Sequence, residues 1–171
     1  MVKSFRKDQI KDALKLTQVS RRFPFLERGD ARYIRVIYED SIISRAFIAK
    51  RMIEFENNPR ALVIANEFGI WPSSEDANLS EALFQHFGCG GNVHIFPCHL
   101  FRSDEMADLI SFLHISLLFG WGCDVYLLGE SEVFYGLDHD GFIDICVNSE
   151  EIFSVYLERW KELDLKVQVH N

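Results

Sequence analysis

The sequence predicts a single α+β domain over residues 1–171, with a mixed or mainly antiparallel sheet packed by about four to five helices. A chain of 171 residues fits one domain, and its 48% apolar and 26% charged residues are ordinary globular values. Segments with helical spacing of apolar residues alternate with short segments rich in β-branched and aromatic residues. Three short strands in succession near the C-terminus favour an antiparallel meander there over a doubly wound parallel sheet.

The N-terminal part of the chain predicts two helices around one strand. The first helix is expected over 5–22, because its apolar residues follow helical spacing at Ile10, Ala13, Leu14 and Thr17. Segment 32–39 is β-branched and aromatic and predicts a strand. Asp40 or Ser41 can cap the next helix, which ends before Pro59. The residues of this helix that we expect to face inward are Ile43, Ala46, Phe47 and Ile53.

The middle of the chain predicts a buried strand, a loop and a helix. Residues 61–68 are almost continuously apolar, as in a central strand buried on both faces. A loop follows over 69–78, and Asn78 with Glu81 then resembles a capping box that begins a helix. The glycines of 88–91 end this helix, and a short strand is expected over 93–96 before Pro97.

The C-terminal part begins with the most apolar helix. Ser103 is expected to cap it, and it extends to about Phe119. Its charge-free run is too short to cross a bilayer, so we expect a buried core helix. Strands are predicted over 124–128, 133–137 and 142–147. Ser149 is expected to cap the last helix, with inward-facing Ile152, Val155, Tyr156, Trp160 and Leu163, and segment 166–169 is a candidate edge strand.

Cysteine usage and the N-terminus favour a cytoplasmic protein. None of the four cysteines forms a C-x-x-C pair, and all have apolar neighbours, namely Cys89, Cys98, Cys123 and Cys146. This pattern predicts reduced, mostly buried thiols. No apolar stretch of signal-peptide length follows the charged N-terminal residues. We therefore expect no export, no membrane partner and no bound metal or cofactor.

Charge is distributed unevenly along the chain, whose net charge is -8. Residues 1–60 hold 14 basic and 8 acidic residues, whereas residues 61–171 hold 4 basic and 18 acidic residues. Unless the two regions pair with each other, an acidic face would attract a basic protein partner. Nucleic acid could use only the N-terminal basic residues Lys7, Lys11, Lys15, Arg21 and Arg22, and the net charge disfavours it.

Two segments are candidate sites. Residues 137–144 place Asp138, His139, Asp140 and Asp144 close together, where a hard cation can bind, although Asp-Gly is also typical of a hairpin turn. Trp71 beside Glu75 and Asp76 would suit a protein partner, or could cover the core. A zinc site or nucleophile at His94, Cys98 and His99 is disfavoured, because no second ligand pair follows and sequence neighbours on a strand point apart.

The stretch HLFRSDEMADLISFLHISLLFGWGCDVYLL, with GLDHDGFIDI after it, resembles small bacterial proteins without catalytic activity. Among these are immunity proteins that neutralise co-encoded toxins. The resemblance lies in the C-terminal half, in the HLF loop, the LFGW helix end and the HDG turn. It implies a basic, toxin-like protein partner, in agreement with the acidic C-terminal region.

We therefore expect a non-enzymatic, immunity-type or inhibitor-type binding protein whose acidic face binds a basic protein. The expected contact residues are Trp71, Glu75, Asp76, Asp138, Asp140 and Asp144. One alternative is a small metal-assisted hydrolase that uses Asp138, Asp140, His139 or His99. The other is an oligomeric structural protein, with a homodimer as its simplest form.

Overall fold

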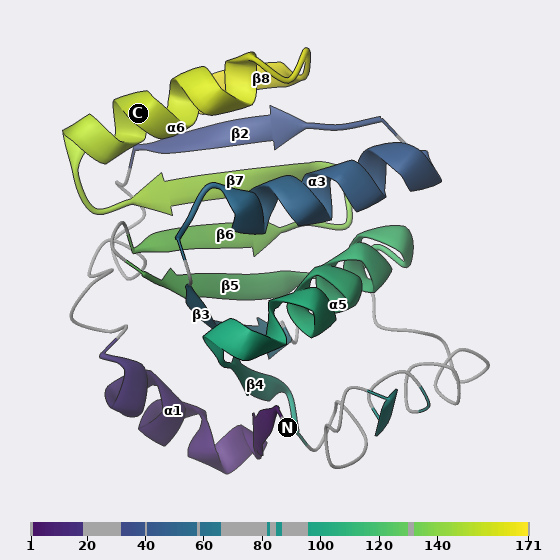
Figure 1. Cartoon of the computed structure of the whole chain (residues 1–171), viewed down its shortest axis with the longest axis vertical. Helices are drawn as coiled ribbons and strands as arrows, with labels where there is room; N and C mark the ends of the chain where they lie inside the picture. The colour runs from purple at the N-terminus through teal and green to yellow at the C-terminus, as the bar shows by residue number, and fades with distance from the viewer. Residues whose placement is uncertain are drawn as a thin grey trace.

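The computed structural model describes residues 2–18, 32–39, 41–57, 59–65, 82, 85–86, 96–129 and 132–170. In these ranges the chain forms four α-helices and one eight-stranded sheet, so the predicted single α+β domain is confirmed (Figure 1). All neighbouring strands are antiparallel, in the order β1-β4-β3-β5-β6-β7-β2-β8.

The element bounds show where each segment lies. The strands are β1 Lys3–Phe5, β2 Tyr33–Ile37, β3 Arg60–Ala65, β4 Cys98–Phe101, β5 Cys123–Leu128, β6 Val133–Leu137, β7 Phe142–Val147 and β8 Lys166–His170. The helices are α1 Ile10–Thr17, α3 Ile42–Glu54, α5 Met106–Leu118 and α6 Glu150–Lys161. The predicted loop 69–78 lies outside the described residues, as does nearly all of the helix expected after Asn78.

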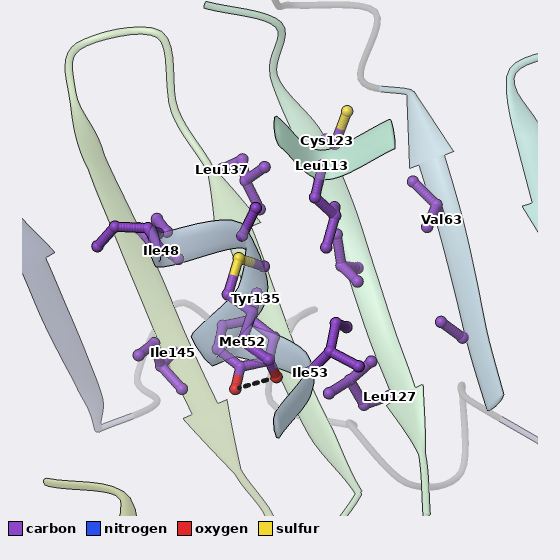
Figure 2. Packing of buried hydrophobic residues seen from close by; sticks show 14 of the residues in the cluster. Ile48, Met52, Ile53, Val63, Leu113, Cys123, Leu127, Tyr135, Leu137 and Ile145 are labelled. Atoms are coloured by element: carbon purple, nitrogen blue, oxygen red, sulfur yellow. Dashed lines mark hydrogen bonds between the residues drawn. The ribbon is translucent and has the colours of Figure 1, made fainter. Parts of the chain in front are cut away.

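Helices α3, α5 and α6 cover one face of the sheet and enclose the larger core. Figure 2 shows Met52 of α3 and Leu113 of α5 packed over the central strands, together with Tyr135 of β6. The Tyr135 hydroxyl donates to the Met52 carbonyl at 3.1 Å, so the most buried phenol of the core is hydrogen-bonded. Burial of these side chains is the main force that holds the helices on the sheet.

The opposite face of the sheet is also apolar. Its buried residues Leu62, Tyr126, Phe134 and Cys146 belong to a second cluster that includes Ala13 of α1. Helix α1 therefore packs on this face near β1 and β4. Strand β3 is consequently buried on both faces, as its continuous apolar sequence predicts.

The structure contains two short strands that the sequence prediction did not include. Residues 3–5 form β1, which takes Phe5 from the helix expected over 5–22, and α1 ends at Thr17, after which Gln18 takes the left-handed φ of 59°. The strand expected over 93–96 lies outside the described residues except for Phe96, and β4 begins directly after Pro97 and pairs with both β1 and β3. Proline is tolerated at the start of a strand, and the Pro97 carbonyl accepts the Ala65 N–H at 2.7 Å.

The predicted inner faces of two helices are partly wrong. Ile43 and Phe47 of α3 are 82% and 37% exposed, and Val155 of α6 is 48% exposed. The residues of α3 that are buried are Ile48, Ala49, Met52 and Ile53. Ser103 does not cap α5 directly, because residues 103–105 form a 3₁₀ turn before the helix.

Other predictions are confirmed. Ser41 and Ser149 cap α3 and α6, and β8 is an edge strand paired only with β2. In the described part of the chain, no helix has the length and apolar character needed to span a membrane.

Candidate partner-binding surface

The structure describes three of the six predicted contact residues. Asp138 and Asp140 lie on the turn between β6 and β7, whereas Asp144 lies within β7. Trp71, Glu75 and Asp76 fall outside the described residues, so their place in the fold is not assigned. The turn thus supplies two of the six predicted contacts.

The turn has the local structure that its Asp and Gly residues favour. The Asp140 N–H donates to Asp138 Oδ1 at 2.9 Å, and Gly141 adopts a left-handed φ of 84°. His139 lies between the two carboxylates, with Nδ1 at 3.4 Å from Asp138 Oδ1 and Nε2 at 3.5 Å from Asp140 Oδ1. The turn therefore presents two carboxylates and an imidazole at the surface.

These three side chains also form the one group in the described ranges with metal-ligand spacing. One ligand atom from each lies within 4.8 Å of the others. His99, the other histidine considered for a metal-assisted reaction, is fully buried in β4 and is not part of this group. Carboxylate oxygen and imidazole nitrogen are donors that divalent metals accept.

Asp144 has a structural partner. Its two oxygens accept from Nε and Nη2 of Arg35, both at 2.7 Å. The guanidinium also lies over the Phe142 ring, 3.8 Å from the ring centroid. The hydrogen bond to Asp144 raises the pKa of Arg35 further above its usual value. Because both oxygens of Asp144 are already bonded and the residue is half-buried, we leave it out of the surface described below.

Three other segments meet beside the turn. A Cβ added to Gly120, just after α5, would lie 3.7 Å from the Cβ of His139. The Tyr38 N–H, just after β2, donates to the Gly141 carbonyl at 3.2 Å. Glu39 follows and is exposed, and Ser41 then begins α3. The turn, the end of α5 and the start of α3 consequently lie at one end of the sheet, on the right in Figure 1.

Large apolar side chains are exposed at this end. Ile42 and Ile43 are 68% and 82% exposed, and Phe119 is 42% exposed while it stacks on the buried Trp121. Arg45 Nη1 donates to the Leu118 carbonyl at 2.9 Å, which joins the start of α3 to the end of α5. We define the acidic end as the surface of Glu39, Ile42, Ile43, Phe119, Asp138 and Asp140.

The sequence prediction missed the apolar part of the acidic end because it assigned Ile43 and Phe47 to the inner face of α3, whereas of its predicted residues only Ile53 is buried. Ile43 and Phe47 follow helical spacing, and so do the residues that are actually buried.

A pocket of about 540 Å³ adjoins the acidic end. It lies between the end of β2, the first turn of α3 and the connection from α6 to β8. Its lining residues are Ile37, Tyr38, Glu39, Ser44, Leu163, Asp164, Leu165 and Lys166.

A second pocket, of about 430 Å³, lies between the end of α3 and α6. The Tyr156 hydroxyl on its wall donates to the Glu56 carboxylate, and Arg159 Nη1 donates to the Phe55 carbonyl at 2.8 Å. Burial raises the pKa of Tyr156 and of the neighbouring Tyr135 above the phenol range, so both hydroxyls stay protonated. The polar groups named here are satisfied within the fold, as in a structural network.

The buried cysteines and His99 do not form a nucleophilic pair. Burial raises the pKa of Cys98, Cys123 and Cys146 to about 12, and all three are free thiols, as predicted; Cys89 lies outside the described residues. Burial lowers the pKa of His99 to about 4, and the Ser4 hydroxyl lies 3.2 Å from His99 Nδ1. A protonated thiol beside a buried imidazole is typical of a core rather than of a nucleophile.

Comparison of this chain with protein-family models, with curated proteins and with solved structures finds no match.

Proposed function

We propose that the chain is a non-enzymatic binding protein of the immunity or inhibitor type, and that its acidic end binds a basic protein partner. The observation that carries this proposal is the exposure of Ile42 and Ile43, next to Glu39 in the chain and at the same end of the sheet as the turn of Asp138.

The two kinds of side chain at the acidic end have complementary roles in binding. Apolar side chains release water when a partner covers them, and this burial supplies affinity. Carboxylates around them attract a basic surface, accelerate encounter and disfavour acidic partners. Single exposed apolar residues are ordinary, but Ile42, Ile43 and Phe119 are gathered at one end of the sheet.

The test is a pull-down from an extract of the source organism with three forms of the protein. The wild type is compared with Asp138→Lys/Asp140→Lys, which reverses two charges of the acidic end. The matched control is Glu151→Lys/Glu158→Lys, which makes the same charge change on two exposed residues of α6. Bound proteins are eluted with increasing salt and identified by mass spectrometry.

We expect one basic protein to bind the wild type and the α6 variant, and to bind the turn variant at least about tenfold more weakly. An Ile42→Ser/Ile43→Ser variant should lose the same protein. Equal retention by all forms would show that the acidic end is not the binding surface. Recovery of no basic protein by the wild type would contradict the proposed function.

A metal-assisted hydrolase is the second candidate, supported by the ligand spacing of Asp138, His139 and Asp140. Zinc, manganese and magnesium would each be added to the purified protein while its melting temperature is measured. A rise that disappears in Asp138→Asn/Asp140→Asn would favour this candidate. Light scattering tests the third, a homo-oligomer without another partner.

A further inference from the structure

The pocket between the end of β2, the start of α3 and the α6–β8 connection adjoins the acidic end. Its lining residues Glu39 and Ser44 stand on either side of Ile42 and Ile43 in the chain. A partner that covers these isoleucines therefore reaches the mouth of the pocket. We infer that the pocket binds a lysine or arginine side chain of the partner, an inference that rests on the proposed function of the acidic end.

The charges that line the pocket favour a cation. Its ionisable groups are the carboxylates of Glu39 and Asp164 and one ammonium group, that of Lys166. All three residues are exposed, and none forms an ion pair within the described part of the chain. An anion would meet two carboxylates there, whereas a cation finds a net negative environment.

Some surface carboxylates of the described ranges have basic partners. Glu54 is bonded by Lys50 and Arg51 of its own helix, and Glu158 is bonded by Lys161. Glu39 and Asp164 line the pocket, and neither has an ion-pair partner among the described residues. Their charges are thus available to a side chain from outside.

The apolar walls suit a long basic side chain better than a small inorganic cation. The remaining walls of the pocket are mostly apolar. They include Ile37, Tyr38, Leu163 and Leu165, which offer carbon surface and one phenol. Lysine and arginine place their methylene groups on such surface and keep the charged group near water. Because Glu39 and Asp164 are exposed, each ion pair adds modest affinity, and the pocket acts mainly through selectivity.

The experiment uses the isolated protein and a small probe. N-acetyl-arginine amide is titrated into the isotope-labelled protein while amide chemical shifts are recorded. N-acetyl-citrulline amide is the matched probe, since it has almost the same shape without the charge. We expect saturable shifts at Glu39, Ser44 and 163–166 with the arginine probe, in the millimolar range, and binding at least about fivefold weaker with citrulline.

Two double variants complete the test. Glu39→Gln/Asp164→Asn should abolish the difference between the probes, and Glu151→Gln/Glu158→Gln should preserve it. Asparagine tolerates the left-handed φ of 56° that Asp164 adopts, so the first variant is expected to fold, which the spectrum itself verifies. Equal shifts from both probes, shifts located elsewhere, or an unchanged preference in the first variant would overturn the inference.

The probe contains no partner, so its result is separate from the pull-down. Selective arginine binding without capture of a basic protein would leave the pocket assigned and contradict the proposed function. Capture of a basic protein at the acidic end without selective arginine binding would support the proposed function and overturn the assignment of the pocket.

Discussion

Asp124 shows how one residue couples the sheet to pH. It lies in β5 opposite Ile64 of β3 and Gly136 of β6, on the face where Asp144 is bonded to Arg35. Burial raises the pKa of Asp124 from 3.8 to about 6, because the carboxylate loses water there. The protonated form is thus favoured in the folded state more than in the unfolded state.

The sign of the resulting pH effect follows directly. The stabilising contribution of protonated Asp124 is complete below pH 3.8 and is lost as the pH rises through about 6. Asp124→Asn, which cannot ionise, should therefore raise the free energy of unfolding at neutral pH by about 1–3 kcal/mol. Urea denaturation across this pH range measures it, with Glu162→Gln as the exposed control. An unchanged or lower stability of Asp124→Asn at neutral pH would contradict the assignment.

At the scale of one element, α3 joins the core to the acidic end. Its buried stripe packs on the sheet beside α5, while its first turn carries the exposed Ile42 and Ile43. The Ser41 hydroxyl accepts the Ser44 N–H at 3.0 Å and so fixes where this turn begins. The cap therefore bears on both stability and the position of the proposed contacts.

Removal of this cap gives a prediction about the element. Ser41→Ala should lower the free energy of unfolding by about 1 kcal/mol, because the Ser44 N–H loses its acceptor. It should also weaken partner capture, whereas Ser41→Asp should restore both. Ser154→Ala is the control, since that hydroxyl is exposed and bonds a carbonyl within α6. Thermal or urea denaturation provides the measurement, and equal effects of Ser41→Ala and Ser154→Ala would refute the role of the cap.

At the scale of the whole molecule, the basic and acidic parts of the sequence pair in places, since Arg32 bonds Glu150 and Arg35 bonds Asp144, but a group of lysines lies apart from the β6–β7 turn. The exposed lysines of the N-terminal segment follow one side of its helical turns, at Lys7, Lys11 and Lys15. This segment lies by β1 and β4, several strands away from the β6–β7 turn (Figure 1). If the proposed basic partner binds at the acidic end, this distance between the lysines and the turn would help to orient it.

Salt should therefore act mainly on association. Once the partner is identified, its association rate should fall at least about tenfold between roughly 50 mM and 500 mM salt, and its dissociation rate should change less. Stopped-flow or surface-plasmon measurements separate the two rates. Asp138→Lys/Asp140→Lys should reduce the salt dependence, and Glu151→Lys/Glu158→Lys should reduce it less. An association rate independent of salt would contradict electrostatic steering by the acidic end.

Local patterns predicted much of this fold. Ser41, Ser149 and the alternating strands after Cys123 act through neighbours in the sequence, and all of them were placed correctly. Strands β1 and β4 were missed because their short sequences are stabilised by pairing across more than ninety residues, as in Ser4 opposite His99. The turn of Asp138 and Asp140 was also predictable, because Asp and Gly favour a turn through contacts with adjacent residues.

The rest of the candidate site depends on tertiary structure. Which side of α3 is buried is decided by α5 and the sheet, so Ile43 and Phe47 were assigned to the wrong face. The pocket joins Glu39 to Asp164, two residues that no sequence pattern connects. The pairing of Asp144 with Arg35 likewise appears only when β7 lies against β2.

The position of β2 in the strand order has a consequence for synthesis of the chain. Both neighbours of β2 are late in the sequence, since it pairs with β7 and β8 and with no earlier strand. During synthesis, the strands that pair with Tyr33–Ile37 are available only after residues from Phe142 onward have been made. Pairing between segments so far apart in the chain is a feature that slows folding, and it leaves this strand unpaired for most of synthesis.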